Sequence, residues 1–299
     1  MLSQWLKLSR PFVINGIMTA GPIALVGMSL SMLIQAQGFL NLSVAAVITL
    51  GAYVAYWLHV LLGVPLMISC AVSILLCGFA GSIFERALFH RLRHRHATSA
   101  ILLLASLGLY VVLQALIEIA FGADVLVLST IARGSTISVL GAFVKPIQLW
   151  TFLIALSVAV ALAFWLSKTR WGIGLRALAE DAELARASGI RSTKVRSQTS
   201  LVACGIAAVC GILVGLDVDL LPAFGMHLFF GGLVVALLGR WAGPWGIAAA
   251  ALFLGLAQQL SVWLIDSRWQ DGVAFLILLI ALLLNPGLVY LTSNPESRG

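Results

Sequence analysis

The sequence predicts an all-α integral membrane protein that forms a single domain over residues 1–299. Of the 299 residues, 61% are hydrophobic and only 10% are charged, whereas soluble domains carry about 25% charged residues. The chain consists of successive apolar runs of about 20 residues, each long enough to cross a hydrocarbon core roughly 30 Å thick as a helix. One long polar segment, Lys168–Arg196, interrupts these runs.

We expect eight or nine transmembrane segments, with a broken or re-entrant segment as one open alternative. The uncharged stretch Gln35–Ser43 is either a surface turn or a helix break within the membrane, and helix breaks in transporters often lie beside the substrate path. The apolar runs that predict the segments are Pro11–Ile34, a run from Ser43 to about Leu62, Val64–Phe84, Thr98–Phe121, Ile147–Ser167, Thr199–Leu216, the short run His227–Leu238, Ile247–Ile265 and Gly272–Leu284.

The distribution of basic residues indicates which side is cytoplasmic. The segments Glu85–Ala97 and Lys168–Arg196 together hold eleven of the eighteen Lys and Arg residues, and basic loops between spans lie in the cytoplasm by the positive-inside rule. The net charge of +7 therefore indicates orientation and not nucleic-acid binding. The acidic residues Asp217, Asp219, Asp266 and Asp271 then fall on the outer side.

The orientation of the N-terminus is open at this point. Three full spans before residue 85 would place Met1 outside, whereas Lys7 and Arg10 favour the inside. A re-entrant piece within Gln35–Leu62 would remove the conflict.

The positions of the ionisable and sulfur-containing side chains in the sequence do not indicate a metal site. The three histidines of Glu85–Ala97 have no cysteine or acidic co-ligands nearby and indicate a solvated basic loop. The four cysteines lie inside apolar runs, where helix packing is their expected role. Gln114 and Glu118 share one helix face, and Glu118 is either a functional intramembrane carboxylate or a residue near the outer end of its span that meets water.

The polar segment Lys168–Arg196 predicts a short amphipathic helix on the cytoplasmic face. Arg176 and Glu180 are spaced i, i+4 for an ion pair, and Gly189 is well placed to end the helix. The helix either lies on lipid or binds a protein partner. Its polar face carries three acids, Glu180, Asp181 and Glu183, and acids are poor neighbours for anionic headgroups, so a protein partner is favoured.

The same segment resembles a known family, the permease subunits of bacterial branched-chain amino acid ABC importers. The resemblance depends on the run G-x-x-x-R-A-x-A-E-D-x-x-x-A-x-x-x-G-I, met here by Gly172, Arg176, Ala177, Ala179, Glu180, Asp181, Ala185, Gly189 and Ile190. Further matches, in the family's order along nearly the whole chain, are Asn15-Gly16, Gly38 with Asn41 and Gly51-Ala52-Tyr53, Glu85-Arg86, Gly108-Leu109 with Gln114, Gly231-Gly232 with Gly239 and Gly246, and Pro286-Gly287.

The resemblance implies that residues 168–196 are a cytoplasmic coupling loop that docks on an ATPase subunit. The residues that it assigns to coupling are Gly172, Arg176, Ala177, Glu180, Asp181, Ala185, Gly189 and Ile190. The implied partners are two cytoplasmic ATPase subunits, a homologous second permease subunit or a second copy of this chain, a periplasmic substrate-binding protein and membrane lipid, in a bacterial inner membrane. The chain itself would hold no cofactor and would not be an enzyme, since ATP and Mg²⁺ would be bound by the ATPase subunits. Independently, the sequence contains no G-x-x-x-x-G-K-[ST] phosphate loop.

The implied substrates are branched-chain or related amino acids. This chain reads Asn41-Leu-Ser-Val-Ala45 where family members often have Asn-Phe-Ala-His-Gly, so a different small polar solute stays open. The side chains that we expect along the substrate path are Gln35, Asn41, Gln114 and Gln258, although helix–helix hydrogen bonding would explain each equally well.

Two other classes of function, an ion-coupled carrier and a membrane enzyme, are alternatives to the importer. An ion-coupled secondary carrier would need intramembrane acids, for which Glu118 is the candidate. A membrane enzyme is disfavoured, because the sequence contains neither H-E-x-x-H nor G-x-S-x-G.

Overall fold

The computed structural model describes residues 2–122, 124–128, 137–139, 142–240, 243–264 and 267–284. The sequence features Pro286-Gly287 and Asp266 lie outside these residues. Within them the chain is almost entirely helical, as the apolar runs predict, and a hairpin of two three-residue strands, β1 (Ile137–Val139) and β2 (Ala142–Val144), lies between the fifth and sixth α-helices.

The helices follow the apolar runs closely. Pro146 begins α6 at a position that needs no backbone N–H donor, and Gly122 ends α5 at φ +79°. The first six helices are α1 (Leu2–Gln37), α2 (Ser43–Tyr56), the π-helix η1 (Trp57–Leu61), α3 (Leu66–Phe84), the π-helix η2 (Glu85–Phe89) and α4 (His90–His94). The others are α5 (Ser99–Phe121), α6 (Pro146–Lys168), α7 (Arg170–Glu180), α8 (Ala182–Ala187), α9 (Ser192–Asp217), α10 (Phe224–Leu238), α11 (Gly243–Leu264), the 3₁₀-helix η5 (Ser267–Trp269) and α12 (Gln270–Leu284).

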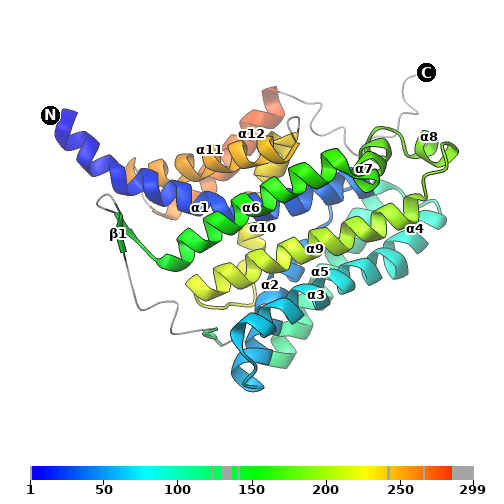
Figure 1. Ribbon diagram of the computed structural model, residues 1–299, viewed down its shortest axis with the longest axis horizontal. Coiled ribbons are helices and arrows are strands. Elements are labelled where there is room, and N and C mark those ends of the chain that lie inside the picture. Colours follow the sequence, from blue (N-terminus) through cyan, green and yellow to red (C-terminus); the bar gives the residue numbers. More distant parts are fainter. Residues whose placement is uncertain are drawn as a thin grey trace.

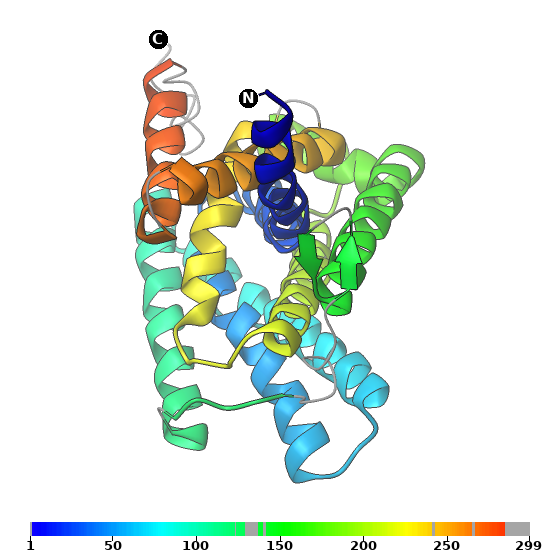
Figure 2. The same ribbon diagram turned by 90° about the vertical axis from the view of Figure 1, so that its left-hand side faces the viewer.

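The long helices run along the long axis of the molecule (Figure 1). Helices α4, α7 and α8 lie at one end, which we call the basic end because it holds both basic segments, and β1 lies at the opposite, outer end. Figure 2 looks onto the outer end, with the start of α1 near the middle. Both basic segments therefore face the same side, as predicted, and the positive-inside rule assigns that side to the cytoplasm.

The direction of α1 decides between the two orientations of the N-terminus. Helix α1 starts at the outer end and finishes at the basic end (Figure 1). Helix α2 runs without a break from Ser43 and continues as η1 to Leu61, a span of 19 residues. Of the two alternatives left open for Gln35–Leu62, the structure therefore has the one without a re-entrant piece, and three full spans precede residue 85, as the simple count requires. The turn between α1 and α2 is the five residues 38–42, with Gly38 at φ +75°.

Helices α1, α2 and α9 form the centre of the bundle. In the 18-residue apolar stretch of α9, 78% of the residues are buried, whereas the corresponding share is 22% in α5 and in α6. Close approach of backbones explains the small residues on α2 and α9: a Cβ on Gly51 would lie 2.7 Å from the Cα of Ala208, and one on Gly211 would collide with the carbonyl of Ile48. Small residues at helix contacts are typical of membrane proteins, where tight packing replaces the hydrophobic driving force.

Two predicted boundaries were wrong. Helix α9 begins at Ser192 and not at Thr199, so the polar residues Ser192–Gln198 extend the span at its basic end. The segment Glu85–Ala97 is not a solvated loop, because η2 and α4 continue α3 as helix to His94 and Glu85 is 1% exposed.

Among the described residues, seven helices are long and apolar enough to cross a membrane, and the shorter apolar helices Phe224–Leu238 and Gly272–Leu283 accompany them. The total of eight or nine segments stays a prediction. The four cysteines are free, and three of them are buried between helices, which fits the expected packing role.

Candidate functional site: the α7–α8 segment and the polar network beneath it

Two short helices, not one, form the polar segment at the basic end. The hydroxyl of Thr169 accepts a hydrogen bond from the backbone N–H of Gly172 (3.2 Å) and caps α7. The carboxylate of Asp181 accepts from the backbone N–H groups of Glu183 (2.7 Å) and Leu184 (2.9 Å) and caps α8. The expected single helix was wrong, because Asp181 has extended backbone geometry (φ −152°, ψ 111°) and separates α7 from α8.

The end of α8 agrees with the sequence prediction. Gly189 has φ +83°, its N–H donates to the carbonyl of Arg186 (3.0 Å), and the N–H of Ile190 donates to the carbonyl of Ala185 (3.0 Å). These two bonds form a Schellman motif, which favours glycine at the left-handed position. The expected stop at Gly189 is confirmed.

One face of α7 packs on the ends of two central helices. Leu175 is fully buried against Ala36, in the last turn of α1, and Val195, in the first turn of α9. Trp171 stacks on Trp165 of α6 at 4.7 Å between ring centroids. The segment is therefore seated on α1, α6 and α9 together.

Arg176 holds α7 against the end of α6. Its Nη2 donates to the carbonyl of Leu166 (3.1 Å), so the expected ion pair with Glu180 is replaced by this contact. Gly172 lies at the same junction, and a Cβ there would collide with the carbonyl of Leu166. Two of the predicted coupling residues thus fix the position of α7.

The other face of the segment is exposed and mixes acids with apolar side chains. Glu180 and Asp181 are exposed, and Leu184 is 66% exposed between them and Arg186. The two backbone N–H donors hold the pKa of Asp181 below its ordinary value of 3.8, because they favour the charged form. The exposed face of the segment is thus mainly charged, with Leu184 as an apolar side chain among the charges.

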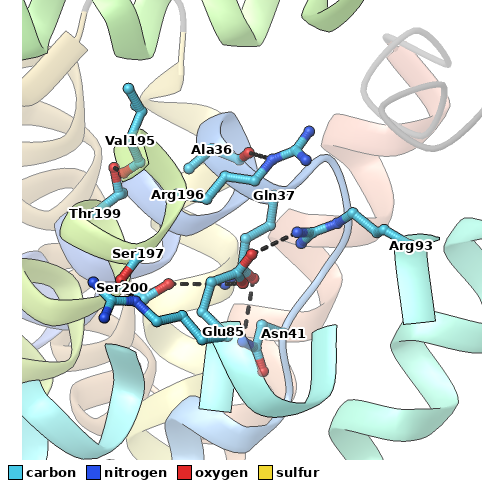
Figure 3. A network of polar contacts seen from close by, with 11 residues as sticks. Ala36, Gln37, Asn41, Glu85, Arg93, Val195, Arg196, Ser197, Thr199 and Ser200 are labelled. Carbon is cyan, nitrogen blue, oxygen red and sulfur yellow. Dashed lines mark hydrogen bonds and ion pairs between the residues drawn. The ribbon is translucent and has the colours of Figure 1, made fainter. Parts of the chain in front are cut away.

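A buried polar network lies directly beneath the segment (Figure 3). Gln37, in the last turn of α1, donates from Nε2 to Glu85 of η2 (2.9 Å) and to Ser200 of α9 (3.2 Å). Its Oε1 accepts from Asn41 (3.2 Å) in the turn before α2, and Asn41 in turn accepts from the hydroxyl of Ser43 (2.6 Å). One amide thus connects four elements.

Glu85 is paired with Arg93 of α4, whose Nη1 donates to Oε1. The guanidinium of Arg93 lies 5.8 Å from the ring centroid of Phe39, in the turn between α1 and α2. A buried carboxylate needs such a partner, because an unpaired charge away from water is strongly destabilising.

Arg196 and Ser197 of α9 extend the network toward α7. Arg196 Nε donates to the carbonyl of Ala36 (2.9 Å), the same residue that packs under Leu175. Ser197 accepts from Arg86 of η2 (2.8 Å) and shares a hydrogen bond with Ser82 of α3 (2.7 Å). The start of α9 is therefore tied both to α1 and to the α3–η2 junction.

Comparisons with known proteins identify the kind of protein that this bundle is. The family described as "Branched-chain amino acid transport system / permease component" matches residues 12–282. This chain belongs to that family. It is 25% identical over 287 residues to the high-affinity branched-chain amino acid transport system permease protein BraD of Pseudomonas aeruginosa, covering 92% of this chain and 93% of BraD. It is 24% identical to the corresponding LivH permease of Escherichia coli K12, covering 91% and 92% of the two chains. No solved structure matches the chain. The protein is a multi-pass permease of the inner membrane.

The permease does not bring the four predicted substrate-path residues together. Gln35 donates to Ser31 (3.1 Å) and lines a cavity of about 550 Å³ between α1, α6 and α11 at the basic end. Asn41 belongs to the buried network. Gln114 donates to Glu118 (3.1 Å) one turn from the end of α5, where Glu118 is exposed at the outer end. Gln258 is buried against the carbonyl of Gln270.

The eight predicted coupling residues of the permease divide by burial. Gly172 and Ala185 are buried, Ala177 and Ile190 are half-buried, and Arg176, Glu180, Asp181 and Gly189 are exposed. Sequence reasoning missed Leu184 on the exposed face and the network residues Gln37 and Arg93. An apolar residue three positions after the capping Asp181 was a signal for Leu184, whereas nothing in the sequence joins Gln37 to Glu85.

Proposed function

We propose that this permease is the membrane subunit of an ATP-driven importer and that α7 and α8 are its coupling segment. One observation carries the proposal: α7 is seated on the ends of α1, α6 and α9, while Glu180, Asp181 and Leu184 face outward. A partner that contacts this face would push directly on central helices of the bundle.

The polar network would transmit a displacement of α7 to the membrane-spanning helices. Movement of α7 would displace Val195 and Arg196 at the start of α9 and Ala36 at the end of α1. Gln37, the residue after Ala36, donates to Glu85 of η2 and to Ser200 of α9, so α9 and the α3–η2 helix would move with α1. Coupling through packed elements with two discrete arrangements is the physical basis of such transmission.

The partners follow from the same assignment. The driving subunits would be two cytoplasmic ATPases that bind ATP and Mg²⁺, since this chain lacks a phosphate loop. A second permease, either homologous or a second copy, would complete the pathway, and a periplasmic binding protein would deliver the solute at the outer end. In this scheme the permease translocates and does not hydrolyse ATP.

For the substrate we propose branched-chain or related amino acids, since the relatives in two bacterial genera are branched-chain amino acid permeases. The departure from the family pattern after Asn41 does not oppose this, because Asn41 contacts Gln37 and Ser43 within the buried turn.

Reconstitution tests the proposal. The permease would be purified with the ATPase, permease and binding-protein products of neighbouring genes and placed in proteoliposomes. Uptake of radiolabelled leucine should require ATP and the binding protein and should stop with an ATPase variant that cannot hydrolyse ATP. Uptake that continues with that variant and follows a proton gradient would contradict an ATP-driven mechanism and support an ion-coupled carrier.

A further inference from the structure

A second polar centre lies at the outer end, far from α7 and α8. It is a cavity of about 360 Å³, a volume typical of sites for small molecules. Its walls come from α1 and from four helices around it, α6, α9, α10 and α11. The residues that line it are Asn15, Met18, Thr19, Pro22, Lys145, Gln148, Thr151, Leu213, Val214, Asp217, Leu228 and Gln259.

One side of the cavity carries two opposite charges. Lys145, just before α6, lies with Nζ 2.7 Å from Oδ1 of Asp217 at the end of α9 and also donates to the Asp217 carbonyl (3.1 Å). Gln148 donates to the other carboxylate oxygen (3.0 Å). The Lys145 and Asp217 side chains are 33% and 19% exposed, so water reaches both, and solvated ion pairs of this kind are weak. A ligand can open the pair at low cost.

The same cavity offers hydrogen-bonding groups that the fold does not use. The side-chain amides of Asn15 on α1 and Gln259 on α11 form no hydrogen bond to any residue that the structure describes. Polar groups that line a cavity in a membrane protein and lack a helix partner are typical of ligand contacts.

The remaining wall is aliphatic. Met18, Leu213, Val214 and Leu228 come from α1, α9 and α10. A ligand with a polar head and a branched aliphatic tail matches this division, because burial of the tail is favourable in proportion to its apolar area.

We propose that this cavity binds a zwitterionic α-amino acid with an aliphatic side chain, whose carboxylate pairs with Lys145 and whose ammonium group pairs with Asp217. This inference rests on the proposed function and assigns the substrate class to a place in the fold. Lys145 and Asp217 together are neutral, so a net-neutral zwitterion can pair with both charges at once, whereas a simple anion or cation can pair with one of them alone. The position at the outer end suits a solute handed over by a periplasmic protein.

The test measures binding to the assembled complex without the binding protein. Radiolabelled leucine binding to the detergent-purified permease complex is followed by scintillation proximity, with unlabelled leucine and leucinamide, which lacks the carboxylate, as competitors. Wild type should bind leucine and discriminate against leucinamide at least tenfold. Lys145→Gln and Asp217→Asn should each weaken leucine binding at least tenfold, and Lys145→Gln should abolish the discrimination.

Two further variants separate ligand contact from a structural role. Asp124→Asn removes an exposed acid near the end of α5 and should leave binding unchanged. Asn15→Leu removes an amide without a fold partner, so it should keep the melting temperature within error and weaken leucine binding several-fold. This variant keeps the test decisive if the ion-pair variants do not fold.

The outcomes distinguish the inference from the proposed function. If the complex with its binding protein takes up leucine with ATP, but the variants at Lys145, Asp217 and Asn15 bind leucine like wild type, the cavity is not the site. If the wild-type complex takes up no branched-chain amino acid at all, the proposed substrate class is wrong, and the inference that rests on it is wrong as well. If leucine binding is lost equally in Asp124→Asn, the effect is unspecific and the inference is overturned.

Discussion

Gln37 and Glu85, separated by 48 positions in the chain, share a hydrogen bond of 2.9 Å in the buried network at the basic end. Gln37 follows Ala36, on which both α7 and Arg196 rest. The coupling segment and the ends of α1, α3 and α9 are thus connected by a short series of direct contacts.

Replacement of Arg93 by Met should leave Glu85 buried without its cationic partner. Removing one member of a buried ion pair costs roughly 3–5 kcal/mol, so thermal unfolding of the detergent-purified permease should shift to a clearly lower temperature. Arg91→Met is the matched control, because Arg91 lies two residues away in α4 and is exposed. Equal shifts in both variants would mean that the buried pair contributes little.

Asp181 should control the formation of α8 through its cap. Asp181→Asn keeps a capping oxygen, whereas Asp181→Ala removes it, so hydrogen exchange in residues 182–187 should rise only in the alanine variant. The folded pKa of Asp181 is lowered. Its stabilisation is therefore complete above the ordinary value of 3.8 and is lost as the pH falls through the lower folded pKa. Protection that decreases in wild type near neutral pH would contradict this assignment.

Gly172 should matter for coupling more than for insertion. A Cβ at this position collides with the carbonyl of Leu166, so Gly172→Ala should displace α7 from the end of α6 and lower ATP-driven uptake several-fold at normal expression. Gly108→Ala in α5 is the control, because no atom lies within 4 Å of its added Cβ. Uptake that is equally high in both variants would show that the contact between α7 and α6 accommodates a Cβ at position 172, which would contradict this prediction.

The span pattern and the exposed polar segment at the basic end could be predicted from the sequence. Apolar runs bounded by basic turns define helices and sidedness because both reflect local transfer energies, and the glycine at 189 defines its stop by its backbone freedom. The contact of α7 with Ala36 and Val195 could be predicted neither from the apolar runs nor from the position of a glycine.

The contacts that join distant segments could not be predicted. Glu85–Ala97 has the composition of a solvated loop, and it is helical because α3 continues past the apolar run and Gln37 and Arg93 satisfy the buried Glu85. The polar residues Gln35, Asn41, Gln114 and Gln258 were grouped by chemistry alone, whereas the rotation of each helix decides where they point. Lys145 and Asp217 meet across 72 positions, and no pattern within one helix indicates such a pair.

Two surface changes test whether the exposed face of α7 and α8 binds a partner. Charge reversal at Glu180 and Asp181 (Glu180→Lys with Asp181→Lys), or replacement of the exposed Leu184 by Asp, alters the exposed face of these two helices. Neither change touches the buried Leu175 contact. Ile173→Asp, at another exposed apolar position of α7, serves as a comparison for the introduction of an acid.

The most direct measurement is co-purification of the ATPase subunits with the tagged permease, together with membrane insertion of each variant. We expect the Glu180–Asp181 reversal and Leu184→Asp to insert normally, to lose most of the bound ATPase and to lose ATP-driven uptake in parallel. ATPase subunits that remain bound at wild-type levels, with uptake unchanged, would contradict a docking role for α7 and α8.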